Sequence, residues 1–266
     1  MKTKAEIRAV NRECWARMVR EGCGFTRPWL NLDRSVLRQY VAGQLNPVPA
    51  PLLDMFPVNV LVDVEGKDVL CLASGGGQQS AVFALLGARV TVVDLAEGQL
   101  EADRTAAAHY GYQVAAVCAD MQDLGFAEGV FDLVYHAPST GFIPDLCAVY
   151  AGVFRALKPK GTYRVCFANP ATEFVECESW DGEAYRITKP YAERVEHYTE
   201  DGANGSLQFR HFMADIFNGL IEQGFSIERV EDNPRYFARE GAEAEPGSWD
   251  HWLTYVGAFA VVARKG

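Results

Sequence analysis

Short apolar segments alternate with helical segments through the middle of the chain, and this alternation constrains the fold more than any other feature. The expected strands span residues 68–72, 90–93, 114–118, 131–135 and 162–167. The expected helices between them span residues 81–86, 97–110 and 145–157. Strands that are almost wholly apolar and are joined by helices form a parallel sheet with helices on both faces. We therefore predict an α/β fold with a doubly wound, mostly parallel sheet.

The segments that flank this core do not show the same alternation of strands and helices. A first amphipathic helix is expected over residues 7–21, and prolines at 47, 49, 51 and 57 interrupt the stretch after it, so residues 1–66 are predicted to be a helical lid segment. The alternation stops again after Pro170, which predicts an insertion at about 170–207. A helix with an apolar face over 209–221 and two last strands, 225–230 and 252–263, complete a domain expected over 67–266.

The composition favours small partners. Asp and Glu total 35 against 25 Lys and Arg, and a net charge of −10 repels the phosphate backbone of nucleic acids. No apolar run approaches the roughly 18 residues that cross a bilayer, and the charged start of the chain lacks a signal core. The seven cysteines include no Cys-x-x-Cys pair, which disfavours a disulfide framework and a zinc site. We expect a cytoplasmic protein with reduced thiols, no membrane, no nucleic acid and no metal; its oligomeric state stays open.

A glycine-rich segment, VLCLASGGGQQS at 69–80, joins the first expected strand to the first helix of the core. Glycines let a ligand approach the backbone, and a helix N-terminus offers free amide donors, although a purely structural turn has the same composition. The second strand ends in Asp94, nineteen residues after Gly75, where a carboxylate can accept both hydroxyls of a ribose. Asp120 follows the third strand and suits an adenine amino group. Together these residues predict a nucleoside site at one edge of the sheet.

The turn distinguishes between nucleoside cofactors. A dinucleotide fingerprint requires glycine or alanine three places after Gly77, where Ser80 stands, and residues 68–80 offer no Lys or Arg to a pyrophosphate. S-adenosylmethionine has no phosphate and carries a positive sulfonium, so it suits this acidic edge better. The pair Tyr185-x-x-x-Lys189 matches short-chain dehydrogenases but lies in the irregular insertion. An NAD(P)-dependent oxidoreductase is therefore the weaker alternative.

Five segments, in this order, resemble the class I S-adenosylmethionine-dependent methyltransferases, in the subgroup similar to quinone-biosynthesis methyltransferases. They are VLCLASGGG at 69–77, VVDLAE at 92–97, CADMQDL at 118–124, FDLVYH at 131–136 and LKPKGTYRV at 157–165. The resemblance implies a Rossmann-like sheet of seven strands, with the last strand antiparallel and inserted beside the fifth. It also implies methyl transfer to a small-molecule acceptor.

The resemblance assigns cofactor contacts to individual residues. Asp94 is expected at the ribose and Asp120 at the adenine amino group, with Leu95 and Met121 on either side of the ring. The other contacts implied in the glycine turn and after the fourth strand are Ala73, Ser74, Gly75, Gly77, Gln79 and His136. The family usually has an acidic residue where Cys71 stands and glycine where Ala73 stands. The partner of the methionine amino group therefore stays open.

The transfer chemistry needs few dedicated side chains. Displacement of a methyl group from a sulfonium is an in-line reaction that alignment and exclusion of water can accelerate, and a base is required only if the acceptor must lose a proton. His136 follows the fourth strand and is the candidate general base, although it suits a fixed hydrogen bond equally well. Ser139, Thr140 and Asp145 are just as suited to turn and helix-cap positions. The lack of an evident base leaves a cofactor-binding module without catalysis as a further alternative.

Aromatic residues gather in the flanking segments. Those of the insertion, Phe174, Trp180, Tyr185, Tyr191 and Tyr198, predict either an acceptor pocket or a satellite core under a long loop. In the N-terminal segment, Trp15, Trp29 and Tyr40 predict either a lid over the cofactor or ordinary packing. His197 is a candidate cavity residue, and His211 is expected to pack beside the apolar helix face.

Overall fold

A computed structural model describes residues 2–192, 196–198, 205–237 and 244–266, with only the backbone described at 196–198. Its centre is a seven-stranded sheet in the order β3-β2-β1-β4-β5-β9-β8, and β6 and β7 form a separate two-stranded hairpin. The strands of the large sheet are β1 (Asp68–Leu72), β2 (Arg89–Asp94), β3 (Val114–Cys118), β4 (Phe131–His136), β5 (Leu157–Ala168), β8 (Phe225–Asp232) and β9 (Ala258–Lys265). The hairpin strands are β6 (Glu196–Tyr198) and β7 (Leu207–Phe209).

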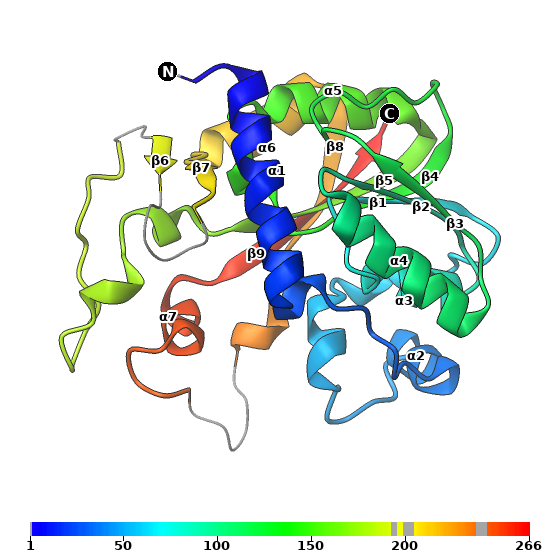
Figure 1. Ribbon diagram of the computed structural model, residues 1–266, viewed down its shortest axis with the longest axis horizontal. Helices are drawn as coiled ribbons and strands as arrows, with labels where there is room; N and C mark the ends of the chain where they lie inside the picture. The colour runs from blue at the N-terminus through cyan, green and yellow to red at the C-terminus, as the bar shows by residue number, and fades with distance from the viewer. Residues whose placement is uncertain (1, 193–195, 199–204, 238–243) are drawn as a thin grey trace.

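Helices cover both faces of the large sheet (Figure 1). They are α1 (Lys4–Glu21), α2 (Arg34–Val41), α3 (Gln79–Leu85), α4 (Glu97–Tyr110), α5 (Leu146–Ala156), α6 (Met213–Glu222) and α7 (Trp249–Val256). Short 3-10 turns join them, among them η2 (Ala50–Asp54), η3 (Val58–Leu61) and η4 (Thr140–Phe142).

The pairing of the strands confirms the predicted doubly wound fold. β1 pairs in parallel with β2 and with β4, β3 pairs in parallel with β2, and β5 with β4. The last strand, β9, lies between β5 and β8 and runs antiparallel to both. The order of the strands reverses between β1 and β4, and ligands of such sheets bind beyond the carboxyl ends of the strands at a reversal of this kind.

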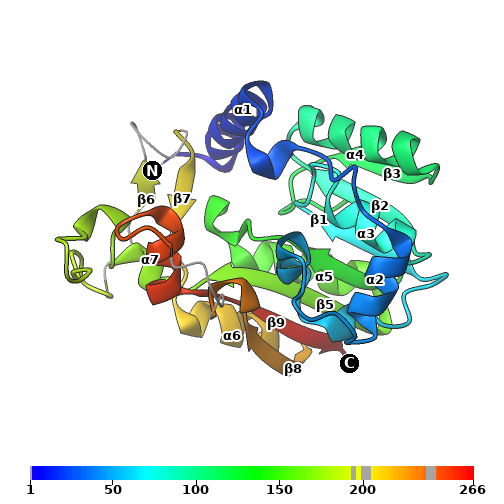
Figure 2. The same ribbon diagram turned by 90° about the horizontal axis from the view of Figure 1, so that it is seen from below.

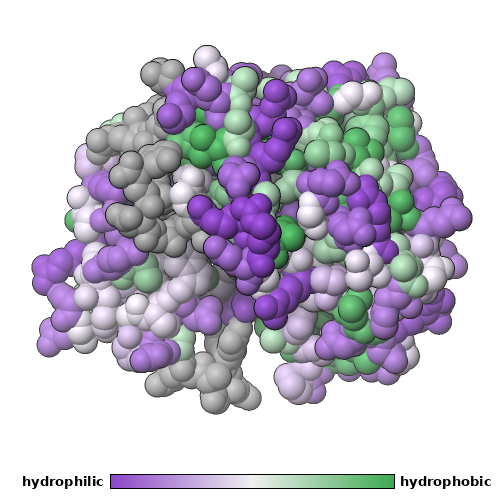
Figure 3. Space-filling model, in the orientation of Figure 1, coloured by the Kyte–Doolittle hydropathy of each residue, from purple (hydrophilic) through white to green (hydrophobic). Residues whose placement is uncertain are grey.

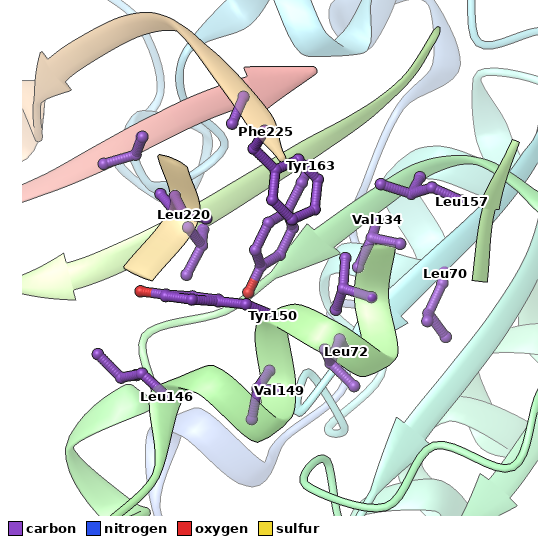
Figure 4. Packing of buried hydrophobic residues seen from close by; sticks show 14 of the residues in the cluster. Leu70, Leu72, Val134, Leu146, Val149, Tyr150, Leu157, Tyr163, Leu220 and Phe225 are labelled. Atoms are coloured by element: carbon purple, nitrogen blue, oxygen red, sulfur yellow. The ribbon is translucent and has the colours of Figure 1, made fainter. Parts of the chain in front are cut away.

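Successive strand residues face opposite layers of helices, as the two-residue period of a strand requires. Leu70, Val134 and Tyr163 join one buried cluster with α5 and α6, and Figure 4 shows Tyr163 beside Phe225 in this cluster. Their neighbours on the opposite face join a second cluster with α2, α3 and the N-terminal turns; they include Val69, Cys71, Leu133 and Tyr135. The near-continuous apolar strands of the sequence are thus buried on both sides.

Helix α1 lies apart from these two layers. Figure 1 shows it crossing the sheet between α4 and the β6–β7 hairpin, and Figure 2 shows it along one end of the molecule above the strand ends. It begins at a reciprocal cap in which the Glu6 amide donates to the Thr3 hydroxyl and the Thr3 amide donates to the Glu6 carboxylate. Its residues Ile7, Cys14 and Met18 are buried at helical spacing.

Two expectations about the C-terminal part of the chain are wrong in detail. The strand expected over 252–263 is helical up to Val256, because Ser248 caps α7 and its buried residues have helical spacing. The helix expected over 209–221 begins at Met213, where the Phe212 amide donates to the Asp215 carboxylate, and residues 207–209 pair with β6 instead. Helix α2, capped by the Asp33 carboxylate, lies within the segment 1–66.

Candidate functional site

The glycine-rich turn is held by two buried carboxylates. The Gly75 amide donates to Asp94 Oδ2 at 3.0 Å, and the Ala96 amide donates to Asp94 Oδ1 at 3.0 Å. Burial raises the pKa of Asp94, and these backbone amides oppose that rise. A Cβ atom on Gly75 would lie 2.5 Å from Gln99 Cβ, so only glycine allows α4 to approach the turn this closely.

The second carboxylate belongs to Asp103 of α4, which the sequence reasoning missed. Asp103 Oδ2 accepts from the Gly76 amide at 3.1 Å, and Oδ1 accepts from the Ser80 hydroxyl. Burial raises the pKa of Asp103 to about 7 in spite of these donors. One sequence feature could have identified it: Asp103 shares the apolar face of the helix with Leu100, Ala106 and Ala107. Because a charged residue is rarely buried without partners, an acid on that face predicts a buried hydrogen-bonding role.

A cleft of about 680 Å³, counted to its open mouth, lies at the carboxyl ends of β1, β2, β3 and β4. Five of the residues that the sequence assigns to the cofactor line it: Ala73, Asp94, Leu95, Asp120 and Met121. The loop after β4 adds Pro138, Ser139, Phe142 and Ile143.

The other assigned residues lie behind this lining in the described structure. Ser74 donates to Gln79 Oε1 at 3.2 Å, and the Gly77 carbonyl accepts from the Trp29 amide at 3.2 Å. A Cβ atom on Gly77 would lie 2.5 Å from the Ala102 carbonyl oxygen. The turn therefore packs tightly between α4 and the N-terminal segment, and contacts from Ser74, Gly75, Gly77 and Gln79 to a ligand stay predictions.

His136 is fully buried and also lies outside the lining. Its Nδ1 is 2.7 Å from the Tyr163 hydroxyl, and its Nε2 is 2.9 Å from Ser139 Oγ. Because Ser139 donates its own proton to the Ala137 carbonyl at 3.1 Å, Nε2 must carry the ring proton and Nδ1 must accept from Tyr163. Burial, reinforced by the charge of Arg164, lowers the pKa of His136 to about 3. The imidazole ring is thus neutral and fully hydrogen-bonded. Among the three hydrogen-bonded side chains Tyr163, His136 and Ser139, Ser139 is the one that lines the cleft.

Helix α1 closes the cleft from above through Ile7, Arg8, Asn11 and Trp15. Figure 3 shows the hydrophilic residues of its outward face across the middle of the molecular surface. Trp15 meets Phe142 edge to face with ring centroids 5.4 Å apart. Of the three N-terminal aromatic residues, Trp15 therefore lines the cleft, whereas Trp29 and Tyr40 pack with the core.

Asn11 fixes α1 to the rest of the molecule, a role that no sequence pattern indicates. Its Oδ1 accepts from the Leu207 amide at 2.7 Å, and its Nδ2 donates to the Leu207 carbonyl at 3.2 Å and to the Phe142 carbonyl at 2.9 Å. A second link joins Lys4 Nζ to Asp145 Oδ2 at 3.1 Å on the surface. Helix α1 is thereby tied to β7, to the loop after β4 and to α5.

The aromatic residues of the insertion do not reach the cleft in the part of the chain that the structure describes. Trp180 and Tyr185 pack against His251 of α7, and Tyr185 shares a hydrogen bond of 2.8 Å with His251 Nδ1. Phe174 and Tyr191 contact each other edge to face. The side chains of His197 and Tyr198 lie outside the described residues. The satellite-core interpretation therefore fits the described aromatic residues better.

His211 Nε2 lies 3.0 Å from each of the carbonyl oxygens of Thr140 and Ile143, so His211 braces the loop after β4. Lys189 forms an ion pair with Glu176, whereas Tyr185 bonds to His251, so Tyr185 and Lys189 do not contribute to one common site.

Among the described residues, every helix is too short or too polar to span a membrane.

Comparisons with known proteins give one consistent result. A family model described as a methyltransferase domain matches residues 70–165. An uncharacterized methyltransferase of Bacillus subtilis (strain 168), YbaJ, is 31% identical over 229 residues, which cover 82% of this chain and 88% of that protein. The structure of a putative S-adenosylmethionine dependent methyltransferase from Listeria monocytogenes aligns with a TM-score of 0.66 at 17% identity, over 81% of this chain and 98% of that one.

A third similar protein was solved with ligands. It is the 1,6-didemethyltoxoflavin-N1-methyltransferase of Burkholderia thailandensis, with bound 1,6-didemethyltoxoflavin and S-adenosylhomocysteine. The alignment has a TM-score of 0.59 at 18% identity and covers 100% of this chain and 91% of that one.

Proposed function

The chain belongs to the class I S-adenosylmethionine-dependent methyltransferases, and from that premise we propose that the cleft under α1 holds S-adenosylmethionine while its methyl group passes to a small-molecule acceptor. The observation that carries the proposal is the pair of carboxylates, Asp94 and Asp120, at the ends of the neighbouring strands β2 and β3 and in the lining of one cleft. A nucleoside offers hydrogen-bond donors to both positions.

The residues present fit this cofactor. Asp94 and Asp120 accept hydrogen bonds, as ribose hydroxyls and an adenine amino group require, and the side chains of Leu95 and Met121 supply apolar contact surface between them. The carboxylates also favour a ligand that carries positive charge. Cys71 is fully buried beneath the turn and outside the lining, so it supplies no charged contact of the kind usual at that position.

When bound, S-adenosylmethionine supplies a methyl group on a positively charged sulfur, which is an activated leaving group. Helix α1 forms one wall of the cleft, and Asn11 holds the helix in that place. A cofactor and an acceptor that fill the cleft would exclude water from the reacting groups. The strand ends hold the cofactor at a fixed position, so the rate would depend mainly on how well the acceptor is aligned with it. A fixed cofactor and an aligned acceptor are what an in-line displacement of the methyl group requires, so the arrangement supports that mechanism.

Ser139 is the polar side chain that the loop after β4 presents to the cleft. We assign it the task of holding the acceptor group, because its oxygen keeps one lone pair after it accepts from His136. His136 acts through Ser139 as a positioning residue in this proposal. Its role as general base stays a prediction that the neutral, fully bonded ring does not favour.

The acceptor itself is proposed by class only. The similar enzyme from Burkholderia thailandensis binds 1,6-didemethyltoxoflavin, a small molecule, which supports an acceptor of that size here. We propose that the segment 1–66 acts as the lid of the 67–266 domain and that the insertion at about 170–207 selects the acceptor, because Leu207 at its end is joined to Asn11 in the cleft wall.

Transfer is tested with cofactor labelled in its methyl group and a pool of cellular metabolites. The wild type is expected to move label into at least one small molecule, and Ser139→Ala is expected to slow this while leaving the affinity for the cofactor unchanged. Cofactor binding without transfer to any metabolite would instead support the binding module without catalysis.

A further inference from the structure

The charged residues of the cleft lie at one end of it. Of the described residues that line the cleft, three are charged: Arg8, Asp94 and Asp120. Arg8 and Asp120 also line a neighbouring hollow together with Lys4 and Gln122, so Arg8 lies at the Asp120 end. Asp94 ends β2 and Asp120 follows β3, and β1 separates these two strands from β4. The charges therefore gather where the proposed function places the nucleoside of the cofactor.

The other end of the cleft, between α1 and the loop after β4, is mainly apolar. Its apolar lining residues are Ile7 and Trp15 of α1 and Pro138, Phe142 and Ile143 of the loop. Trp15 and Phe142 are only partly buried, so their rings keep surface that a ligand can cover. A charged acceptor would lose hydration here without meeting an opposite charge, which is costly. Aromatic rings gain additional energy from contact with one another, so this end suits a neutral molecule with an aromatic body.

Among the residues that the structure describes, Asn11 and Ser139 are the polar members of this end. Both side-chain N–H groups of Asn11 are taken by backbone carbonyl oxygens. The Ser139 hydroxyl donates its hydrogen to the Ala137 carbonyl and accepts from His136. A hydroxyl oxygen has two lone pairs, so one remains, and no donor in the described part of the chain takes it. Ser139 can therefore bond to a ligand only by accepting a hydrogen.

We infer that the acceptor is a neutral aromatic molecule with a hydroxyl or N–H group that donates to Ser139 Oγ, while its ring lies against Trp15 and Phe142. The inference rests on the proposed function and narrows its acceptor to one chemical class. Carboxylates, phosphates and quaternary ammonium ions fall outside this class, because the apolar end offers them no opposite charge. Ethers and tertiary amines fall outside it as well, because they bring no hydrogen to Ser139.

The test uses three probes that share a benzene ring: phenol, anisole and benzoate. At neutral pH phenol is uncharged and has a donor, anisole is uncharged and has none, and benzoate is an anion. Ligand-observed NMR gives their affinities for the protein saturated with S-adenosylhomocysteine, so the measurement does not depend on turnover. We expect the wild type to bind phenol about tenfold more tightly than anisole, as one hydrogen bond implies, and to bind benzoate most weakly.

Two variants separate the hydrogen bond from the ring contacts. Ser139→Ala removes the hydroxyl and is expected to lower the affinity for phenol to that for anisole. Trp15→Leu removes ring surface and is expected to weaken phenol and anisole by the same factor, because Ser139 stays in place. Ser35→Ala is the control: Ser35 is exposed on α2 and lies outside the cleft lining, so this variant should bind all three probes as the wild type does.

The results that overturn the inference are distinct from failure of the proposed function. S-adenosylhomocysteine is titrated first, and if the wild type does not bind it, the proposed function fails and the inference fails with it. If it binds, the inference is overturned when no probe binds, when benzoate binds as tightly as phenol, or when phenol has no advantage over anisole. A Ser139→Ala variant that keeps the advantage of phenol also overturns it. If that variant does not fold, the three affinities of the wild type decide.

Discussion

The carboxylate of Asp103 accepts a hydrogen bond from the Gly76 amide at 3.1 Å, which ties the middle of α4 to the glycine-rich turn. Ser80, at the start of α3, donates to the same carboxylate. Two helices and the turn therefore meet at one buried acid that does not line the cleft itself.

Asp103 makes stability depend on pH. Its pKa is raised from 3.8 to about 7, so the folded chain keeps a proton that the unfolded chain has already lost. Stability from this group is therefore lost as pH rises between these values. Asn resembles the protonated acid, so the stability that Asp103→Asn loses relative to wild type is expected to be smaller at about pH 8 than at about pH 5.5. Urea unfolding at both values checks this, and an equal or larger loss at the higher pH contradicts it.

His136 is expected to stay neutral well below the ordinary range of histidine. Burial lowers its pKa to about 3, and its hydrogen bonds require the proton on Nε2. Nitrogen-15 NMR of the imidazole ring should show the Nε2–H tautomer with no titration between about pH 8 and pH 5. A positively charged ring near pH 6 would restore His136 as a candidate acid or base.

Asn11 is expected to stabilise α1 far more than Lys4 does. Asn11→Ala leaves buried polar groups of Leu207 and Phe142 unpaired, which costs about 1–3 kcal/mol. Lys4→Ala removes an exposed ion pair with Asp145, which costs less than about 1 kcal/mol. Denaturant unfolding gives the free energies, and amide exchange along α1 shows whether the helix opens. Equal losses for the two variants would argue against the buried link.

Ala73 occupies a left-handed backbone conformation with φ of 46°. Residues other than glycine pay roughly 1–2 kcal/mol there, so Ala73→Gly is expected to raise the free energy of unfolding by about 1 kcal/mol. Ala107→Gly in the interior of α4 is the control and should lower stability by about 1 kcal/mol. A destabilised Ala73→Gly variant would show that the methyl group at this position packs against more than the cleft.

The core of the fold follows from local pattern alone. The segments 68–72 and 114–118 are apolar, short and bounded by turn residues, and both are strands with the predicted ends. The last strands were harder to predict, because Trp252 and Val256 are as apolar as strand residues and only the Ser248 cap marks the helix. Apolar runs of this length suit either structure when they are read without their caps.

That Asp94 and Asp120 line one cleft was predictable, because each acid follows the end of one of two neighbouring parallel strands. The walls of the cleft were not predictable where they depend on contacts between distant segments. Asn11 bonds to Leu207, 196 residues away, and nothing near Asn11 in the sequence indicates that partner.

Calorimetric titration with S-adenosylhomocysteine tests most directly whether the cleft is the cofactor site. Asp120→Ala removes a carboxylate from the cleft lining, whereas Asp123→Ala removes the same charge from the same loop outside that lining. We predict binding to the wild type and to Asp123→Ala with similar affinity, and at least about tenfold weaker binding to Asp120→Ala. Absence of binding to the wild type, or equal affinity of all three proteins, would contradict the placement of the cofactor in this cleft.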